Sequence, residues 1–260
     1  MSDFVRLLTF TTILAFACAG LTSCASDGNP AEEDPDSFEA VKDIHGGPFS
    51  DMTLVYLKTG PRTDLTEQQK TAVFNGHMSN MKRLADAGIL LIAGPFNKPR
   101  DASWRGIFLL DTSSVALAHL QAETDPGIRA GVFVADYRPI KASILLRHTG
   151  DVEKAMQAER AEKPAEGRPQ IRPYVMVTAA DAATLMPSLA EAGYGDKVVW
   201  AAKFSAKGDR DAVAVIDAEK VEEVQAALDK AGVTGLSLDG WYATPSLLRL
   251  EPSVRTIPQK

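Results

Sequence analysis

His77 is the side chain in this sequence best suited to acid–base chemistry. The chain has four histidines, and an imidazole titrates close to neutral pH, so it can accept and return a proton. His119 and His148 have no companions at metal-ligand spacing, so we interpret them as surface residues. His45 stands beside two glycines in a polar stretch and is interpreted as inert. A hydrogen-bonded core histidine remains the structural alternative for His77.

The segment that presents His77, residues 76–95, predicts the second half of a helix, a glycine stop, an apolar strand and a turn at Gly94-Pro95. The helix should begin at Thr66, which opens a capping box, and end at Gly88. Helical spacing predicts a buried face made of Val73, Phe74, Met78, Met81, Leu84 and Ala85. Backbone amides near the Gly94 turn would form a polar cradle for an oxyanion.

Residues 51–140 predict a first folded unit of the order β-α-β-β-α-β, the ferredoxin-like motif. Pro126 should end the second helix and Pro139 the last strand. The strands are 52–57, 89–93, 106–110 and 132–136, with helices over 66–88 and 112–124. The strands are apolar on both faces, yet helices in this topology cover only one, so the other face must pack against a second sheet.

Residues 171–250 repeat this order after a connector over 141–170. Its strands are expected at 174–177, 198–204, 212–216 and 236–242, with helices over 182–192 and 219–230. A single offset of 106 residues relates Ile107–Asp111 to Val213–Asp217, Val115 to Val221, and Pro139 to Pro245. We therefore predict an α+β fold: two tandem ferredoxin-like units that pack sheet to sheet, an intrachain version of a dimeric α/β barrel.

The chemistry is not repeated with the scaffold. On this alignment Asp125 falls opposite Ala231, and His77 falls opposite Ala182 or its neighbour. Gly94-Pro95 falls opposite Ala202-Lys203. Any reaction should therefore belong to the first unit, and the second unit is a degenerate copy.

The run from His77 to Pro95, followed by Asp125-Pro126-Gly127-Ile128-Arg129-Ala130-Gly131, resembles the YciI-like (YCII-related) family. The resemblance covers about residues 52–140 and implies a His-Asp pair, His77 and Asp125, in a pocket between helix and sheet, beside Gly94 and Pro95. One branch of that family eliminates chloride from chlorinated hydroxyquinols, which implies lyase-type chemistry. Ser79, Ser103 and Arg129 are candidate polar helpers for ligand binding. Asp125 has a purely structural alternative, as the end of a helix.

The N-terminal sequence predicts a cellular location outside the cytoplasm. Residues 7–21 are apolar, too short to cross a bilayer comfortably but typical of a signal peptide. They end in Leu21-Thr22-Ser23-Cys24, which resembles a bacterial lipobox. We expect a signal peptide over 1–23, a lipid anchor at Cys24 on the outer membrane or the periplasmic face, and an acidic disordered tether over 24–50. An ordinary secretory signal is the alternative, and 251–260 is assigned as a tail.

Composition excludes some classes of partner and site. The net charge of -6 argues against nucleic acid as a partner, and both cysteines lie near the N-terminus, so the folded part has no thiolate metal site. No phosphate loop or metal motif is evident, and we expect no cofactor and no metal. Two hypotheses follow: a tethered lyase- or isomerase-type enzyme acting on a small cyclic or aromatic metabolite, or a non-catalytic lipoprotein that binds a ligand or protein. The chain would act as a monomeric pseudo-dimer or a homodimer.

Overall fold

The computed structural model describes residues 48–162, 171–206 and 208–250. The predicted signal peptide, Cys24, His45, most of the tether and the tail lie outside the described residues. Within the described ranges, no helix is both long and apolar enough to cross a bilayer.

Eight antiparallel strands form a closed barrel. The strands are β1 (Phe49–Thr59), β2 (Leu90–Asn97), β3 (Trp104–Leu110), β4 (Phe133–Ser143), β5 (Arg172–Ala179), β6 (Val198–Phe204), β7 (Ala212–Ile216) and β8 (Leu236–Ala243). The order around the barrel is β1-β3-β2-β8-β5-β7-β6-β4. Two seams close it: β2 pairs with β8, and β4 pairs with β6.

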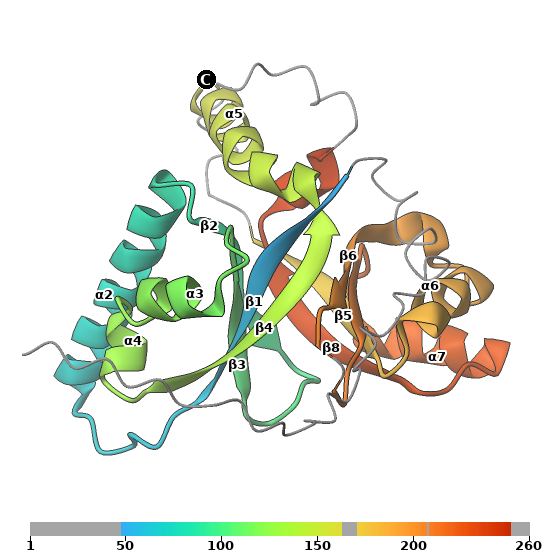
Figure 1. Cartoon of the computed structure of the whole chain (residues 1–260), viewed down its shortest axis with the longest axis horizontal. Helices are drawn as coiled ribbons and strands as arrows, with labels where there is room; N and C mark the ends of the chain where they lie inside the picture. The colour runs from blue at the N-terminus through green and yellow to red at the C-terminus, as the bar shows by residue number, and fades with distance from the viewer. Residues whose placement is uncertain (1–47, 163–170, 207, 251–260) are drawn as a thin grey trace, which may run out of the picture. The chain divides into compact units, whose positions relative to one another are not determined.

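Helices cover the outside of the barrel. They are α2 (Glu67–Asp86), α3 (Val115–Ala122), α4 (Pro126–Arg129), α5 (Thr149–Ala161), α6 (Ala182–Glu191) and α7 (Val221–Ala231), with short 3-10 turns η1 (Ile144–His148), η3 (Gly195–Lys197) and η4 (Pro245–Arg249). Figure 1 shows α2, α3 and α4 against the strands of the first half, and α6 and α7 against those of the second. The predicted connector thus contains a helix, α5, and β1 begins inside the predicted tether, at Phe49.

Side chains alternate between the two faces of each strand, so the apolar core has three clusters. One lies inside the barrel, and two lie outside it, under the helices. Met52, Leu54 and Tyr56 of β1 point into the barrel, where they join inward side chains of the second half such as Trp200 and Trp241. Val55 and Leu57 point outward under α2, α3 and α4, and a separate cluster lies under α6 and α7. The two-sided apolar strands expected to need a second sheet are therefore buried by closure of the barrel.

The two halves carry the same irregularity at the same place. A register shift between Leu90 and Ile92 in β2 is matched by one between Val198 and Trp200 in β6. The predicted equivalence of Val115 and Val221 agrees with the structure, because these residues begin α3 and α7.

The predicted equivalence of Pro139 and Pro245 is wrong. Pro139 lies inside β4, paired with Thr53, whereas Pro245 follows β8 in η4. The constant offset fails because the first half contains an extra helix, α4, before its last strand. Pro139 also does not end the strand as predicted, since β4 continues to Ser143.

Helix α2 has the predicted ends but a different buried face. Thr66 caps it with both hydrogen bonds of a capping box, and Gly88 follows its end with a positive φ of 70°. Phe74 and Met78, expected to be buried, are 60% and 47% exposed. The helix is rotated so that Asn80 and Leu84 are buried, which places a polar residue where the apolar pattern predicted none.

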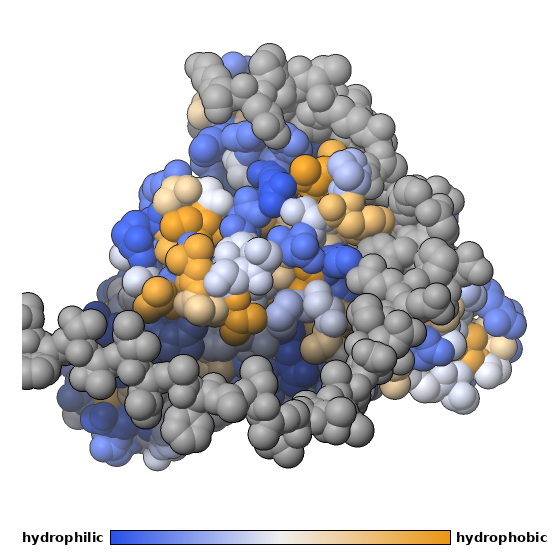
Figure 2. All heavy atoms as spheres, in the orientation of Figure 1, coloured by the Kyte–Doolittle hydropathy of each residue, from blue (hydrophilic) through white to orange (hydrophobic). Residues whose placement is uncertain are grey.

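Large apolar side chains of α2 and α3 are exposed at the surface. In Figure 2 hydrophobic side chains gather over the region of α3, among hydrophilic ones. Leu117 and Leu120 of α3 are exposed, as are Phe74 and Met78 of α2. The apolar residues at helical spacing in α2 therefore include exposed as well as buried side chains.

Candidate functional site

His77 and Asp125 lie in direct contact. Nδ1 of His77 is 2.8 Å from Oδ2 of Asp125. His77 is on α2, and Asp125 is the N-cap of α4, whose first residues are Pro126 and Gly127. The predicted helix end at Asp125-Pro126 is thus also the start of another helix, a role that Asp and Pro both favour.

The carboxylate of Asp125 is fully buried and held by three donors. Besides His77, the backbone N–H of Gly127 donates to Oδ1 at 2.8 Å, and Nδ2 of Asn80 lies 3.4 Å from Oδ2. Burial alone would raise the pKa of Asp125, but the hydrogen bond and charge of His77, with the Gly127 and Asn80 donors, hold this pKa below its ordinary value. Asp125 therefore stays ionised and fixes the orientation of the imidazole.

A further layer of polar contacts holds Asn80. Its Oδ1 accepts from Nη2 of Arg83 at 2.8 Å and from Oγ1 of Thr124 at 3.1 Å. The same Arg83 nitrogen donates to Oγ1 of Thr124 at 2.9 Å. These contacts join α2 to the segment between α3 and α4, so the network has a structural role whatever its chemistry.

Two aromatic rings enclose the imidazole. The Phe108 ring lies 5.8 Å from it at an interplanar angle of 20°, and the Phe133 ring lies 5.4 Å from it. The His77 side chain keeps 13% of its surface exposed. Its Nε2 atom has no hydrogen-bond partner among the described residues, so no protein group occupies the proton-accepting position of this nitrogen.

Glycines allow this close approach. A Cβ on Gly76 would lie 2.9 Å from Cγ of Pro126, so a larger residue would push α2 away from α4. A Cβ on Gly127 would lie 2.6 Å from the Phe133 ring. Gly76 had no evident purpose within a helix; its purpose is contact with the segment that carries Asp125.

The other predicted site residues are not gathered around His77. Ser79 and Arg129 are exposed on α2 and α4. The predicted turn at Gly94-Pro95 is wrong: β2 continues through it, with Gly94 opposite Ile107. The Gly94 carbonyl accepts from Nε1 of Trp241 at 3.1 Å, and a Cβ on Gly94 would lie 1.9 Å from a β8 carbonyl oxygen.

The extended conformation at Gly94 has a physical reason. Glycine allows β2 to approach β8 closely at the seam that closes the barrel. The structure thus assigns Gly94 a packing role that was not predicted, and it contains no turn there to form an oxyanion cradle.

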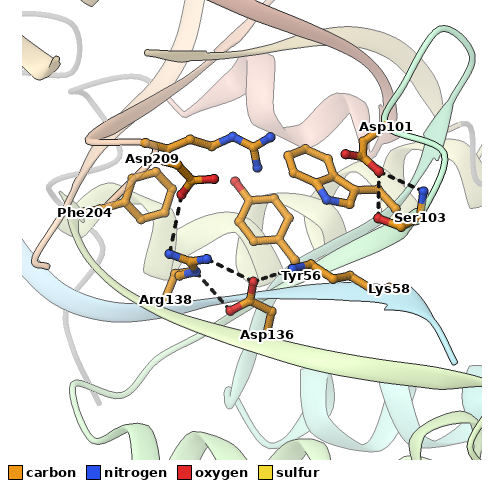
Figure 3. A pocket seen from close by; sticks show the side chains of 10 residues that line it. Tyr56, Lys58, Asp101, Ser103, Asp136, Arg138, Phe204 and Asp209 are labelled. Atoms are coloured by element: carbon orange, nitrogen blue, oxygen red, sulfur yellow. Dashed lines mark hydrogen bonds and ion pairs between the residues drawn. The ribbon is translucent and has the colours of Figure 1, made fainter. Parts of the chain in front are cut away.

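Ser103 lies in a different place, a pocket at one end of the barrel interior. This pocket has a volume of about 140 Å³ and is lined by Tyr56, Lys58, Asp101, Ser103, Trp104, Asp136, Arg138, Phe204, Asp209 and Arg210. Figure 3 shows Phe204 and Asp209 on one side of the Tyr56 hydroxyl and Asp101 and Ser103 on the other. Neither His77 nor Asp125 lines it.

Sequence reasoning missed Asn80 and this pocket. Asn80 lies three residues after His77, a spacing that places both on one helix face, and this signal was available. The pocket draws residues from both halves of the chain, and no local motif marks it. Among the described residues, no group of three or more His, Cys, Asp or Glu side chains could hold a metal ion.

Comparisons with known proteins give little further information. No family model matches the chain, and no curated protein matches it. Among solved structures, it is similar to the siroheme decarboxylase NirDL, with a TM-score of 0.38 and 10% sequence identity over 78% of this chain and 72% of that one. A likeness this weak says nothing about the activity of this chain.

Proposed function

We propose that this protein is a membrane-tethered YciI-like enzyme of the lyase or isomerase type, in which His77 transfers a proton on a small cyclic or aromatic metabolite. The observation that carries the proposal is the 2.8 Å contact between His77 Nδ1 and the buried Asp125 carboxylate. A carboxylate that accepts the Nδ1 proton leaves the opposite nitrogen, Nε2, as the base and stabilises the imidazolium that forms.

The finer description of the fold is part of this proposal. Each half has its strands in the order fourth-first-third-second: β4-β1-β3-β2 and β8-β5-β7-β6. The matching register shifts in β2 and β6 support a duplication. We take the chain to be a tandem pair of ferredoxin-like units, an intrachain dimeric α/β barrel in which only the first unit kept a His-Asp pair.

Isotope exchange tests the proton transfer directly. The full-length chain is incubated in D₂O with a panel of cyclic ketones, enols and hydroxyaromatic compounds, and deuterium incorporation is followed by NMR. A His77→Gln variant should lose the enzymatic exchange by about 10²-fold or more, while His119→Gln, which changes an exposed histidine, should not. Exchange that survives His77→Gln would refute the proposal.

The second candidate is a non-catalytic lipoprotein that binds a small ligand or a protein. The observation that favours it is the network of Asn80, Arg83 and Thr124 around Asp125, which joins α2 to the α3–α4 segment and would be needed without any reaction. Under this hypothesis, His77→Gln lowers the melting temperature but alters no exchange rate.

The cellular location of the protein is tested separately. We propose that Cys24 carries the lipid anchor and that the folded part faces away from the cytoplasm. A Cys24→Ser protein should leave the membrane fraction; if it remains there, the anchor lies elsewhere.

A further inference from the structure

The Tyr56 hydroxyl is a buried polar group without a partner. Tyr56 is 2% exposed, and its hydroxyl oxygen has no hydrogen-bond partner among the described residues. A buried donor left unpaired is destabilising, and a hydrogen-bond acceptor on a bound molecule would relieve that cost. Tyr56 lines the pocket at the barrel end, and Figure 3 shows its hydroxyl among the other lining side chains.

A cationic side chain in the same pocket is also without a polar partner. Arg210 makes no hydrogen bond or ion pair within the described part of the chain; its Cζ lies 4.1 Å from the centre of the Trp104 ring. Arg210 is close enough to Tyr56 to influence its titration, although burial is the main cause of the raised Tyr56 pKa. A phenol and a guanidinium that face one space together supply the donors that a carboxylate accepts.

The remaining cations of the pocket are already neutralised. Asp136 accepts from Lys58 at 2.7 Å and from Arg138 at 2.9 Å, and Arg138 also lies 3.9 Å from Asp209. These four side chains form one ion-pair network along the pocket wall (Figure 3). Arg210 is therefore the cationic side chain of the pocket that makes no ion pair with the described residues and has donors left to bind an anion.

The acidic groups near Arg210 limit the strength of such a site. Asp101 accepts from both the backbone N–H and the hydroxyl of Ser103, and Asp239 accepts from the backbone N–H of Asp101 at 2.7 Å. Both carboxyls are thus occupied by donors, yet their charge lowers the positive potential. We expect weak binding that depends on the hydroxyl as well as on the charge.

We propose that this pocket is a binding site for a small aromatic carboxylate, distinct from the His77–Asp125 pair. Tyr56 and Arg210 would bind the carboxylate, and the rings of Trp104 and Phe204 would contact the aromatic part. One water needs about 10–15 Å³ of such space, so 140 Å³ holds roughly ten atoms, enough for one ring and one carboxylate.

Access to the hydroxyl requires movement of a neighbouring side chain. The Tyr56 oxygen has less than 1 Å² of exposed surface, and we infer that Arg210 moves, because it makes no hydrogen bond or ion pair to the described residues and only stacks on Trp104. The site combines Tyr56 of β1 with Phe204 and Arg210 of the second half, so it exists only when the barrel is closed.

Calorimetric titration of the full-length chain tests the site, with benzoate as probe. Benzamide has the same shape without the charge, and acetate has the charge without the ring. Benzoate should bind saturably and at least about 10-fold more tightly than either. Tyr56→Phe removes only the oxygen and should weaken benzoate binding by on the order of 10-fold or more, as should Arg210→Gln.

Tyr137→Phe is the matched control, because Tyr137 carries another buried hydroxyl without a partner, outside the pocket. Its benzoate affinity should equal that of the wild type. The proposal is overturned if the wild type does not bind benzoate, if benzamide or acetate binds equally well, or if Tyr56→Phe and Tyr137→Phe bind alike. Exchange catalysed through His77 is measured independently, so either proposal can fail alone.

Discussion

Replacing Asp125 with asparagine should destabilise the protein strongly although it changes one atom. The carboxylate accepts from His77, Gly127 and Asn80. An asparagine can keep its oxygen toward the Gly127 amide, but its NH₂ group then faces two donors. The substitution removes charge-assisted hydrogen bonds and leaves buried donors unpaired.

The size of the effect follows from these losses. A hydrogen bond to a charged group contributes about 1.5–3 kcal/mol, and an unsatisfied buried donor costs about 1–3 kcal/mol. Because His77 can adopt its other tautomer and relieve part of the conflict, we expect a total near 3 kcal/mol. For a domain of this size that corresponds to a fall in melting temperature of roughly 6–12 °C.

Thermal denaturation followed by circular dichroism measures this change, with Asp86→Asn as the control. Asp86 is an exposed carboxylate on the same helix, and its loss should change the stability by less than about 0.5 kcal/mol. Equal melting temperatures for the two variants would refute the inference that Asp125 organises this region.

The pH dependence gives a second test of the same residue. Since the pKa of Asp125 in the folded chain lies below the ordinary 3.8, its ionised form stabilises the fold above that pH. The contribution is lost as the pH falls through the lowered pKa. The difference between wild type and Asp125→Asn should therefore shrink as the pH falls below about 4, where the carboxyl of Asp125 takes up its proton. A difference that grows below pH 4 would have the wrong sign.

Two further substitutions test the packing and the electrostatics. Gly76→Ala gains about 1 kcal/mol of helix propensity but places a Cβ 2.9 Å from Pro126. The cost of this overpacking should exceed the gain, so the melting temperature should fall. Gly150→Ala is the control, because its Cβ would have nothing within 4 Å, and it should not lower the melting temperature. Urea denaturation that ranks Gly76→Ala above the wild type would contradict this. Asp239→Asn should raise the melting temperature at pH 7. Burial raises the pKa of Asp239, so the ionised carboxylate opposes folding at neutral pH. The asparagine oxygen can still accept the hydrogen bond from the Asp101 backbone N–H. This gain should vanish below about pH 4, and a loss of stability at pH 7 would refute it.

Much of the fold could be predicted because its signals are local. The Thr66 capping box, the stop at Gly88 and the strand Val198–Phe204 appear in the structure as expected. Each depends on backbone chemistry or on a short apolar run, which acts within a few residues along the chain. The need for a second sheet also followed from strands that are apolar on both faces.

The incorrect predictions concern contacts between distant segments. Phe74 and Met78 fit a helical apolar period, but the period does not say which way the helix faces once α4 packs on it. Gly94-Pro95 is typical of a turn, yet the pairing of β2 with β3 and the approach of β8 keep it extended. Tertiary contacts outweighed local preference at both places.

The sequence alone determined the order of the eight strands and of the helices α2, α3, α6 and α7, but not α4 or α5. It also singled out His77 as the residue to examine, because these signals depend on residue type and spacing. Only the tertiary structure brought the His77 imidazole to 2.8 Å from a carboxylate 48 residues away and buried that carboxylate. It alone placed Tyr56 and Arg210 in one pocket. The physical reason is that barrel closure sets distances between strands remote in the chain, and these distances decide which polar groups are paired and which remain available.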